Sequence, residues 1–351
     1  MLKTWLTQTL DLSVPIISAP MASRAGGELA HAVSAAGGLG MLGAGRVVSP
    51  EWIAENATIA RYGPIASSTD GDGVPSSPGT RTEAALSNRN AGTGGEITPL
   101  RFGIGLMTWA IDEDRALLDA SLATGPALIS LSFGDPSPYV EDVHSVGSLA
   151  AMQVNTLADL RLAETAGIDL IIVQGAEAGG HTGQRATLPL LQDVLESTEL
   201  PVVAAGGIST GRGLAAVLAA GAHGAMIGTA LLASPEVTMP EGLRERILAA
   251  ESDDTVYTSV FDLAQRQPWP SRWGGRALRN EFTDRWHGRG SELADDADAA
   301  GEVRAANSSG DPGNASVYAG EAVGAVRESL PAGEVIQRIN AEAEARLRSL
   351  L

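Results

Sequence analysis

One stretch of the sequence combines a buried strand, a glycine-rich turn and two ionisable side chains. Residues 171–173 are Ile-Ile-Val, a short apolar run typical of a fully buried parallel strand. The loop that follows has glycines at positions 175, 179, 180 and 183, where the backbone can turn sharply and approach a ligand closely. It also carries Glu177 and His181, one of only five histidines in the chain. The stretch predicts an active-site loop at the end of a parallel strand.

His181 suits two kinds of chemistry. Imidazole titrates near neutral pH, so the side chain could act as a general base or donate a hydrogen bond to an anionic substrate. A purely structural histidine is the less favoured alternative, because a Gly-Gly-His-x-Gly loop offers little bulk to bury it. A metal site with Glu177 is also disfavoured, since the intervening glycines break helical spacing and no second histidine lies nearby. We expect no metal.

Two later turns have the composition of an anion site. Gly206-Gly207 and Gly228-Thr229 each follow an apolar run and precede a predicted helix. Backbone N–H groups and the helix dipole favour negative charge at such a position, and the hydroxyls of Ser209, Thr210 and Thr229 would add donors. Tight turns without a ligand are the alternative. We interpret the pair as a site for a phosphate-bearing ligand.

These groups can form one site only if the fold brings the ends of the strands together, and the sequence pattern predicts such a fold. Short apolar segments alternate with helical ones over about 230 residues, which requires a parallel sheet with right-handed crossovers. The eight predicted strands are residues 14–19, 39–44, 102–106, 127–132, 149–154, 169–173, 201–205 and 224–227. Eight such units match a (β/α)8 TIM barrel better than an open doubly wound sheet. We therefore predict an α/β fold with this barrel in residues 1–250.

Two regions depart from the alternation. Residues 66–98 are rich in serine, glycine, aspartate, threonine and asparagine and contain no aromatic residue, so we predict a disordered surface insertion rather than a lid. Residues 251–311 mix tryptophan and arginine with an acidic stretch, and helical segments follow near 320–329 and 334–350. We expect residues 251–351 to form a C-terminal helical cap packed on the barrel.

The composition limits the partners. The net charge is −18, from 42 acidic and 24 basic residues, and such a surface repels nucleic acid and anionic membranes. The absence of cysteine excludes disulfides, thiolate metal sites and iron–sulfur clusters. The acidic, lysine-poor composition suggests a halophilic or high-GC source. The N-terminal residues lack a signal-peptide pattern and no apolar run approaches ~18 residues, so we expect a cytoplasmic protein.

The residue types also narrow the ligand class. A Schiff-base aldolase needs a lysine on a barrel strand, but Lys3 is the only lysine and precedes the first strand. The lack of a strand lysine and of any cysteine nucleophile favours a cofactor such as FMN, which brings its own reactivity, over a sugar phosphate. Gln153 and Gln174 end neighbouring strands, and their amides suit the hydrogen-bonding edge of a flavin ring. Met21 and Trp109 would supply apolar walls, although ordinary core packing explains them equally well.

Several segments together match one known family. They are residues 15–22, 36–40, 174–183, 205–208, 211–213, 228–229 and 318–320. With these segments the chain resembles the nitronate monooxygenases, formerly called 2-nitropropane dioxygenases. The Glu-Ala-Gly-Gly-His run at 177–181 is quite specific, whereas Ala-Gly-Gly-Ile alone occurs in many phosphate-binding barrels. The match covers nearly the whole chain except 66–98 and 291–310.

The resemblance implies an FMN-dependent barrel that oxidises alkyl nitronates with dioxygen, with His181 as the catalytic or substrate-orienting histidine. The residues that it implies for FMN binding are Gly179, Gly180, Gly206, Gly207, Gly228 and Thr229, with Pro20, Met21 and Ala22 along the ring. Many members have Gly-Val-Asn-Leu after the third strand. Here Gly105 stands at the asparagine position, so that contact with the flavin is missing and the substrate could differ.

Other activities stay open at this stage. FMN-dependent enoyl-acyl carrier protein reductases and NAD(P)H:quinone reductases belong to the same superfamily and keep a similar loop. A barrel that binds a phosphate-bearing ligand without redox chemistry is a further alternative. We expect a small-molecule substrate and dioxygen as partners, and the sequence does not indicate an oligomeric state.

Overall fold

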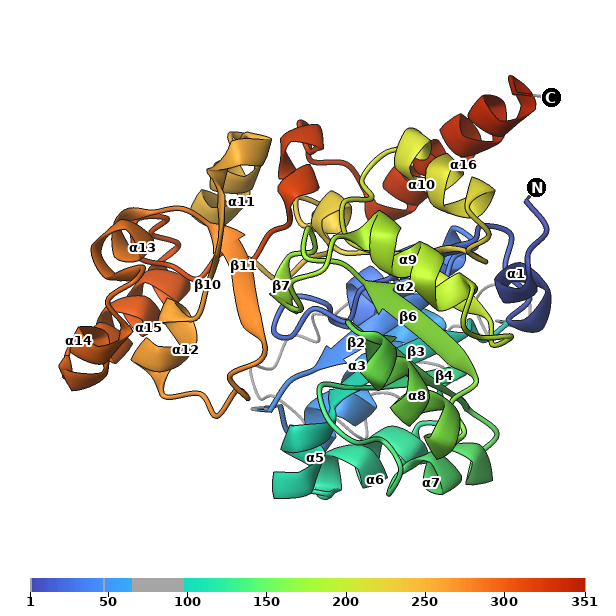
Figure 1. Cartoon of the computed structure of the whole chain (residues 1–351), viewed down its shortest axis with the longest axis horizontal. Coiled ribbons are helices and arrows are strands. Elements are labelled where there is room, and N and C mark those ends of the chain that lie inside the picture. Colours follow the sequence, from blue (N-terminus) through green and yellow to red (C-terminus); the bar gives the residue numbers. More distant parts are fainter. Residues whose placement is uncertain (1, 47, 65–97, 351) are drawn as a thin grey trace, which may run out of the picture.

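A closed barrel of eight parallel strands forms the larger part of the molecule (Figure 1). The computed structural model describes residues 2–46, 48–64 and 98–350. In the sheet, the strands follow the order β1-β9-β8-β6-β5-β4-β3-β2, and a parallel bridge from Ile17 to Leu39 joins its two edges. The strands are β1 (Ile16–Ser18), β2 (Gly40–Ala44), β3 (Phe102–Met107), β4 (Leu128–Ser132), β5 (Leu149–Val154), β6 (Leu170–Gln174), β8 (Val202–Ala205) and β9 (Ala225–Ile227). The predicted (β/α)8 barrel is confirmed, while the predicted insertion at 66–98 lies outside the described residues, apart from Thr98.

Helices connect successive strands as the alternation predicts. They are α2 (Gly27–Ala35), α3 (Pro50–Tyr62), α5 (Thr108–Glu113), α6 (Ala116–Ala123), α7 (Val140–Ser145), α8 (Leu157–Ala166), α9 (Thr187–Leu195) and α10 (Gly211–Ala219). The Ser49 side chain caps α3 by accepting from the Trp52 amide. The connection from β3 to β4 contains two short helices, α5 and α6, because Asp114 between them is extended and its carboxylate accepts from the Ala116 amide.

The ring position after β9 is filled by the last helix. The sequence predicted a helix directly after Gly228-Thr229, but the chain makes only the 3-10 turn η1 (Thr229–Leu231) there. Helix α16 (Ala332–Arg348) packs instead against α10 and α2, with Ile336 and Ile339 buried in the barrel's outer core (Figure 1). The C-terminal helix thus completes the ring of barrel helices, inside the segment that the sequence placed in the cap.

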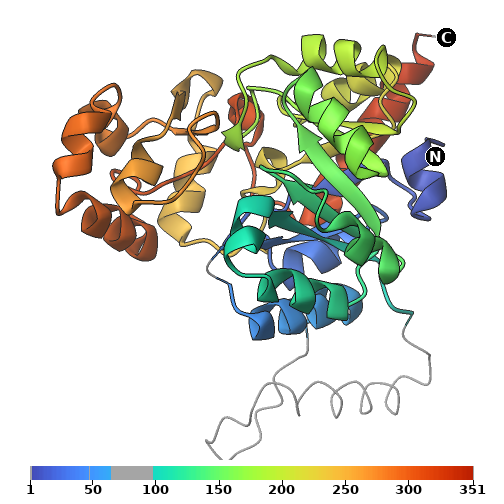
Figure 2. The same cartoon turned by 60° about the horizontal axis from the view of Figure 1, so that its bottom comes forward.

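The rest of the C-terminal segment forms a lobe beside the barrel (Figure 2). It contains α11 (Glu241–Leu248), α12 (Val260–Gln265), α13 (Glu281–Trp286), α14 (Gly290–Asp295) and α15 (Ala299–Ser309). Its strands β10 (Thr255–Thr258) and β11 (Gly274–Leu278) form an antiparallel sheet with β7 (Gly180–Thr182), which comes from the loop after β6. This sheet was not predicted, and it corrects the purely helical picture of the cap. The lobe is tied to the barrel through β7.

The opposite end of the barrel is closed. Helix α1 (Trp5–Thr9) covers it, and Leu6 and Leu10 pack with Ile17 and Leu39 in the barrel interior. Each such side chain contributes about 1.5–3 kcal/mol by its burial. A ligand therefore has access to the strands from their carboxyl ends. Within the described ranges, no helix combines the length and apolarity that a bilayer crossing requires.

Glycines at the open end let the chain after β1 approach its neighbours. A Cβ on Gly43 would lie 2.4 Å from the Met21 carbonyl oxygen, and one on Gly105 would lie 2.3 Å from the Pro20 ring. Both distances are shorter than any real contact of a Cβ atom. Gly105, at the position where many family members have asparagine, is therefore required here by the packing of Pro20.

We predict that Gly105→Ala destabilises the protein by roughly 1–3 kcal/mol, because the new methyl group must displace Pro20. The free energy of unfolding, measured in urea with an unchanged slope, checks this. Gly301→Ala in α15 is the matched control, since a Cβ there meets no atom within 4 Å. It should be neutral or stabilising. A neutral Gly105→Ala would show that Pro20 does not exclude a side chain.

Candidate active site

The carboxyl ends of five neighbouring strands carry most of the predicted site residues. The five strands are β5, β6, β8, β9 and β1, which lie side by side in the barrel. Gln153 lies at the end of β5 and Gln174 at the end of β6. The other residues follow the remaining three strands: Gly206 and Gly207 after β8, Gly228 and Thr229 after β9, and Pro20, Met21 and Ala22 after β1. Gly179, Gly180 and His181 follow from the loop after β6. The parallel strands thus bring Pro20 and Thr229, which are 209 positions apart, to one rim.

His181 lies in a strand rather than a free loop. In β7 it pairs with Gly275 of β11, which fixes its backbone against the lobe. Its Nε2 lies 2.9 Å from Oδ2 of Asp262 on α12, and the two side chains are only 10% and 9% exposed. A carboxylate and an imidazole so shielded from water interact strongly. The histidine that the sequence predicts to be catalytic therefore has a partner from a different part of the chain.

Tyr318 completes this group on the side of Asp262. Its hydroxyl lies 3.4 Å from the other carboxylate oxygen, Oδ1. Burial raises the pKa of Tyr318 well above its ordinary value, and the nearby charge of Asp262 and their hydrogen bond raise it further. Tyr318 thus remains a neutral donor to Asp262. A carboxylate can only accept, so Nε2 of His181 donates to Asp262, and no described residue forms a hydrogen bond with Nδ1.

A tryptophan covers one face of the imidazole. Trp269 stacks on His181 with ring centroids 3.5 Å apart and the planes 7° from parallel. It comes from residues 266–273, which link α12 to β11. Trp109 and Phe133, from the ends of β3 and β4, contact its edge at 5.2 and 4.9 Å. The histidine is therefore held between a carboxylate and an aromatic group.

Amide side chains link the barrel rim to the backbone of His181. Gln174 Nε2 donates to the His181 carbonyl oxygen at 3.2 Å. Its Oε1 accepts from Gln153 Nε2 at 2.7 Å and from Asn155 Nδ2 at 3.2 Å. Both ends of the Gln174 amide are thus engaged, which makes it a support for His181. Gln153 keeps its Oε1 without a partner among the described residues, and its contact with a flavin stays a prediction.

Glu177 has a structural task. Its carboxylate accepts from the amide and from the hydroxyl of Thr187, at 2.9 and 2.8 Å, and so caps the start of α9. Within the part of the chain that the structure describes, no group of three or more histidine, aspartate or glutamate side chains is arranged to hold a metal ion.

The turn after β8 has the form of an anion-binding nest. Gly206 and Gly207 have φ values of +104° and +72°, and the amides of residues 207–209 find no acceptor among the described residues. The Ser209 hydroxyl is buried and also lacks a partner. Successive free N–H groups in such a turn form a concavity for an oxyanion. The start of α10 is less free, because the Gly211 amide donates to Glu342 of α16 at 3.1 Å. The candidate phosphate site thus lies at the turn.

Close backbone contacts join the chain after β6 and after β9 to segment 318–320. The Gly320 amide donates to Thr229 Oγ1 at 2.9 Å. A Cβ on Gly179 would lie 2.6 Å from the same amide nitrogen, so only glycine fits. A Cβ on Gly180 would meet nothing within 4 Å. Segment 318–320 therefore closes the site between the ends of β6 and β9.

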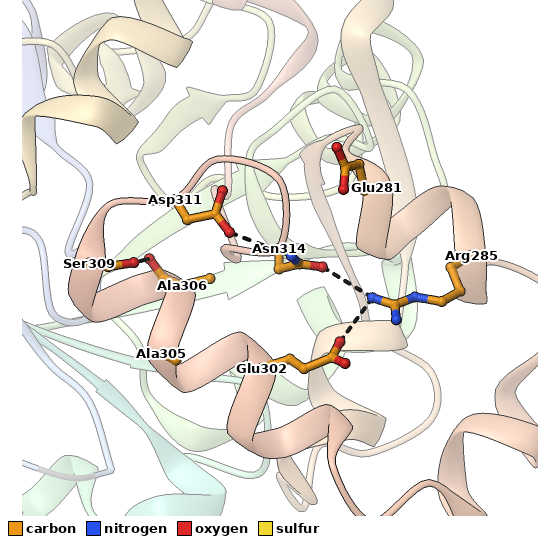
Figure 3. A pocket seen from close by; sticks show the side chains of 8 residues that line it. All are labelled: Glu281, Arg285, Glu302, Ala305, Ala306, Ser309, Asp311 and Asn314. Carbon is orange, nitrogen blue, oxygen red and sulfur yellow. Dashed lines mark hydrogen bonds and ion pairs between the residues drawn. The ribbon is translucent and has the colours of Figure 1, made fainter.

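A hollow of about 650 Å³ lies elsewhere, between α13, α15 and the loop after α15 (Figure 3). Arg285 is the one cation among its lining residues, and it donates to Glu302 at 2.8 Å and to Asn314 at 3.1 Å. Its other polar lining side chains are Glu281, Ser309 and Asp311. None of the predicted site residues lines this hollow.

The sequence did not indicate Asp262, Trp269 or Asn155. Asp262 is 81 positions from His181, inside a short helix of no distinctive pattern. Trp269 stands between two prolines in the irregular segment 266–273. Proline restricts the backbone, so these two neighbours were the one feature of the local sequence that indicated a fixed position for the tryptophan.

Known proteins resemble this chain both in sequence and in structure. The family model described as nitronate monooxygenase matches residues 100–342. A nitronate monooxygenase of Neurospora crassa is 29% identical over 381 residues, covering 99% of this chain and 93% of its own. The structure of FabK from Thermotoga maritima matches with a TM-score of 0.77 at 27% identity, covering 100% and 99% of the two chains. The structure of a nitroalkane oxidase from Streptomyces ansochromogenes matches with a TM-score of 0.74 at 27% identity, covering 99% of each. On these grounds the chain belongs to the nitronate monooxygenase family.

Proposed function

We propose that the protein oxidises alkyl nitronates with dioxygen and uses FMN as its cofactor. The observation that carries this proposal is the shielded pair His181–Asp262, which faces the same barrel rim as the anion nest after β8. A nitronate is a delocalised anion, and such a substrate needs a donor or base beside the redox cofactor. Family membership and the likeness to a nitroalkane oxidase support the same reaction class.

The residues present fit FMN. The free amides of 207–209 and the unpartnered hydroxyl of Ser209 offer donors to a phosphate. The other groups that would hold the cofactor are Pro20, Met21, Ala22, Gln153, Gln174, Gly179, Gly180, Gly206, Gly228 and Thr229. Of the two glutamines, Gln153 offers the free amide oxygen and Gln174 acts as its support. When bound, FMN would accept electrons from the substrate and transfer them to dioxygen.

The protein's own contribution is to place and stabilise charge. Nδ1 of His181 has no described partner, so it would take the α-carbon proton of a neutral nitroalkane to give the nitronate, or, once protonated, donate to a nitronate oxygen. Asp262 holds the tautomer and stabilises the imidazolium that forms. Trp269 keeps water from one face of the ring and adds a cation–π contact to the charged form.

A second candidate is an FMN-dependent NAD(P)H:quinone or enoyl-thioester reductase. The likeness to FabK from Thermotoga maritima favours it, since that structure matches over the whole chain with a TM-score of 0.77. The non-redox reading, in which the nest holds another phosphate-bearing ligand, receives less support, because both the family and the nitroalkane oxidase point to redox chemistry.

Two spectroscopic measurements test the proposal. Purified protein should show flavin absorbance bands, and their absence after reconstitution with FMN would support the non-redox reading. Anaerobic addition of propyl-2-nitronate should bleach these bands faster than NADH does, and oxygen should restore them. Rapid bleaching by NADH alone, with no response to nitronate, would establish the reductase instead.

Ser209→Ala tests the nest. Hydrogen bonds to charged groups are worth about 1.5–3 kcal/mol, so the dissociation constant of FMN should rise roughly tenfold or more. Quenching of flavin fluorescence by the apoprotein measures it. Ser308→Ala is the matched control, because that hydroxyl is exposed on α15 and bonds within its own helix. Equal affinities for both variants would place the phosphate elsewhere.

Asp262→Asn tests the partner of His181. Loss of the carboxylate removes the group that fixes the tautomer, so kcat/KM for nitronate should fall on the order of 100-fold, mostly through kcat. FMN affinity should stay unchanged, and Asp262→Glu should recover part of the rate. Asp284→Asn, an exposed aspartate on α13 of the same lobe, is the control. A wild-type rate in Asp262→Asn would refute the role of this pair.

A further inference from the structure

The aromatic side chains at the barrel mouth form one connected wall around His181. Trp269 lies flat on the imidazole, with a centroid distance of 3.5 Å. Trp109 and Phe133 meet Trp269 edge-on, at interplanar angles of 68° and 85°. We name these three side chains the aromatic wall. Edge-to-face contacts of this kind fix ring orientations as well as burying apolar area.

The backbone is strained where it supplies one member of the wall. Phe133 follows β4 and has a φ of +67°, in the left-handed region that residues with a bulky side chain rarely adopt. Strained conformations persist where the surrounding structure holds them, and they cluster at ligand sites. Here the conformation accompanies contacts of the ring with both Trp269 and Trp273, at 4.9 and 5.4 Å. The position of Phe133 is thus maintained against a backbone cost.

The segment that carries Trp269 is anchored to the barrel on its other side. Arg272 forms an ion pair with Asp159 at 3.0 Å, and the side chain of Asp159 is only 5% exposed. The guanidinium also lies 3.8 Å from the centre of the Trp273 ring. Trp273 Nε1 in turn donates to Asn155 at 3.1 Å. Trp269 is therefore preorganised over His181, which lowers the entropic cost of binding a ligand against it.

The wall also contains a polar group without a partner. Nε1 of Trp109 is shielded from solvent and has no acceptor in the described ranges. A buried donor left unpaired is costly, so this position favours a ligand that brings an oxygen acceptor into apolar surroundings. Trp109, Phe133 and Trp269 are all partly exposed, so a ligand can reach the edge of the wall.

We propose that the aromatic wall is the specificity-determining surface of the site, and that it selects nitronates carrying a flat apolar substituent, such as a phenyl group, next to the reacting carbon. This rests on the proposed function. The nitronate oxygens match the free donors of the site, and a planar apolar group gains ring contacts with Trp269 and Phe133. A second charge on the substrate would have to be desolvated against the wall without a counter-ion.

The test compares ligands with and without the flat group on the FMN-loaded protein. Phenylacetate and acetate serve as unreactive anions, and their dissociation constants come from calorimetry. Wild type should bind phenylacetate at least tenfold more tightly, and kcat/KM should favour the nitronate of phenylmethane over that of ethane to a similar degree. Trp269→Ala should reduce both preferences to about twofold, whereas Trp269→Phe should keep most of them.

Trp5→Phe is the matched control. Trp5 also contacts a histidine ring, His223, at 6.4 Å, but it lies at the closed end of the barrel. It should leave both preferences unchanged. FMN content shows that each variant is folded, and Trp269→Phe provides the comparison if Trp269→Ala does not fold.

Two results would overturn the inference: equal binding of phenylacetate and acetate by wild type, or an undiminished preference in Trp269→Ala together with an undiminished one in Trp269→Phe. Tight binding of phenylacetate that depends on Trp269, without turnover of any nitronate, would instead refute the proposed function and leave the wall established as a ligand surface.

Discussion

The hydrogen bond between His181 and Asp262 is the contact on which the arrangement of the site depends. It joins a strand that leaves the barrel after β6 to a helix of the C-terminal lobe, over 2.9 Å. Both side chains are nearly buried, so removing Asp262 would leave Nε2 of His181 without a partner, and removing His181 would leave the Asp262 carboxylate with Tyr318 alone. Either loss is more costly than that of the bond itself. The pairing of β7 with β11 and the stacking of Trp269 act in the same direction. The geometry of the proposed catalytic pair therefore depends on how the lobe docks against the barrel.

Close backbone approach is the second constraint, and it explains where glycine is needed. Gly179 lies against Gly320, and Gly105 lies against Pro20, at distances that exclude any Cβ atom. These contacts bring the ends of β6, β9 and β1 near enough to share one ligand. The departure from the family pattern at Gly105 thus follows from packing, and it removes an amide side chain from the flavin side of the proposed site.

The sequence predicted what local patterns determine. Apolar runs and helix caps such as Ser49 located the eight strands and most helices, and the glycines marked the turn at 206–207. What it could not predict depends on distant pairing. Strand β7 has only three residues and forms by pairing with β11, about 90 positions away. Helix α16 follows the lobe in the chain but packs in the barrel ring, and Asp262 meets His181 only because the lobe docks on the barrel. Gln174 was placed correctly at the rim, but its amide supports His181 from within the protein.

The negative charge of the chain limits how the site can recognise its ligands. The chain carries a net charge of −18, yet its proposed cofactor and substrate are both anions. The nest at 206–209 contains no cationic side chain, so attraction there comes from oriented N–H groups, which act over a short range. Glu342 accepts from the Gly211 amide at the start of α10, so this amide is not free to bind an anion. Recognition in this site therefore depends on shape and hydrogen-bond geometry at contact, rather than on steering from a distance.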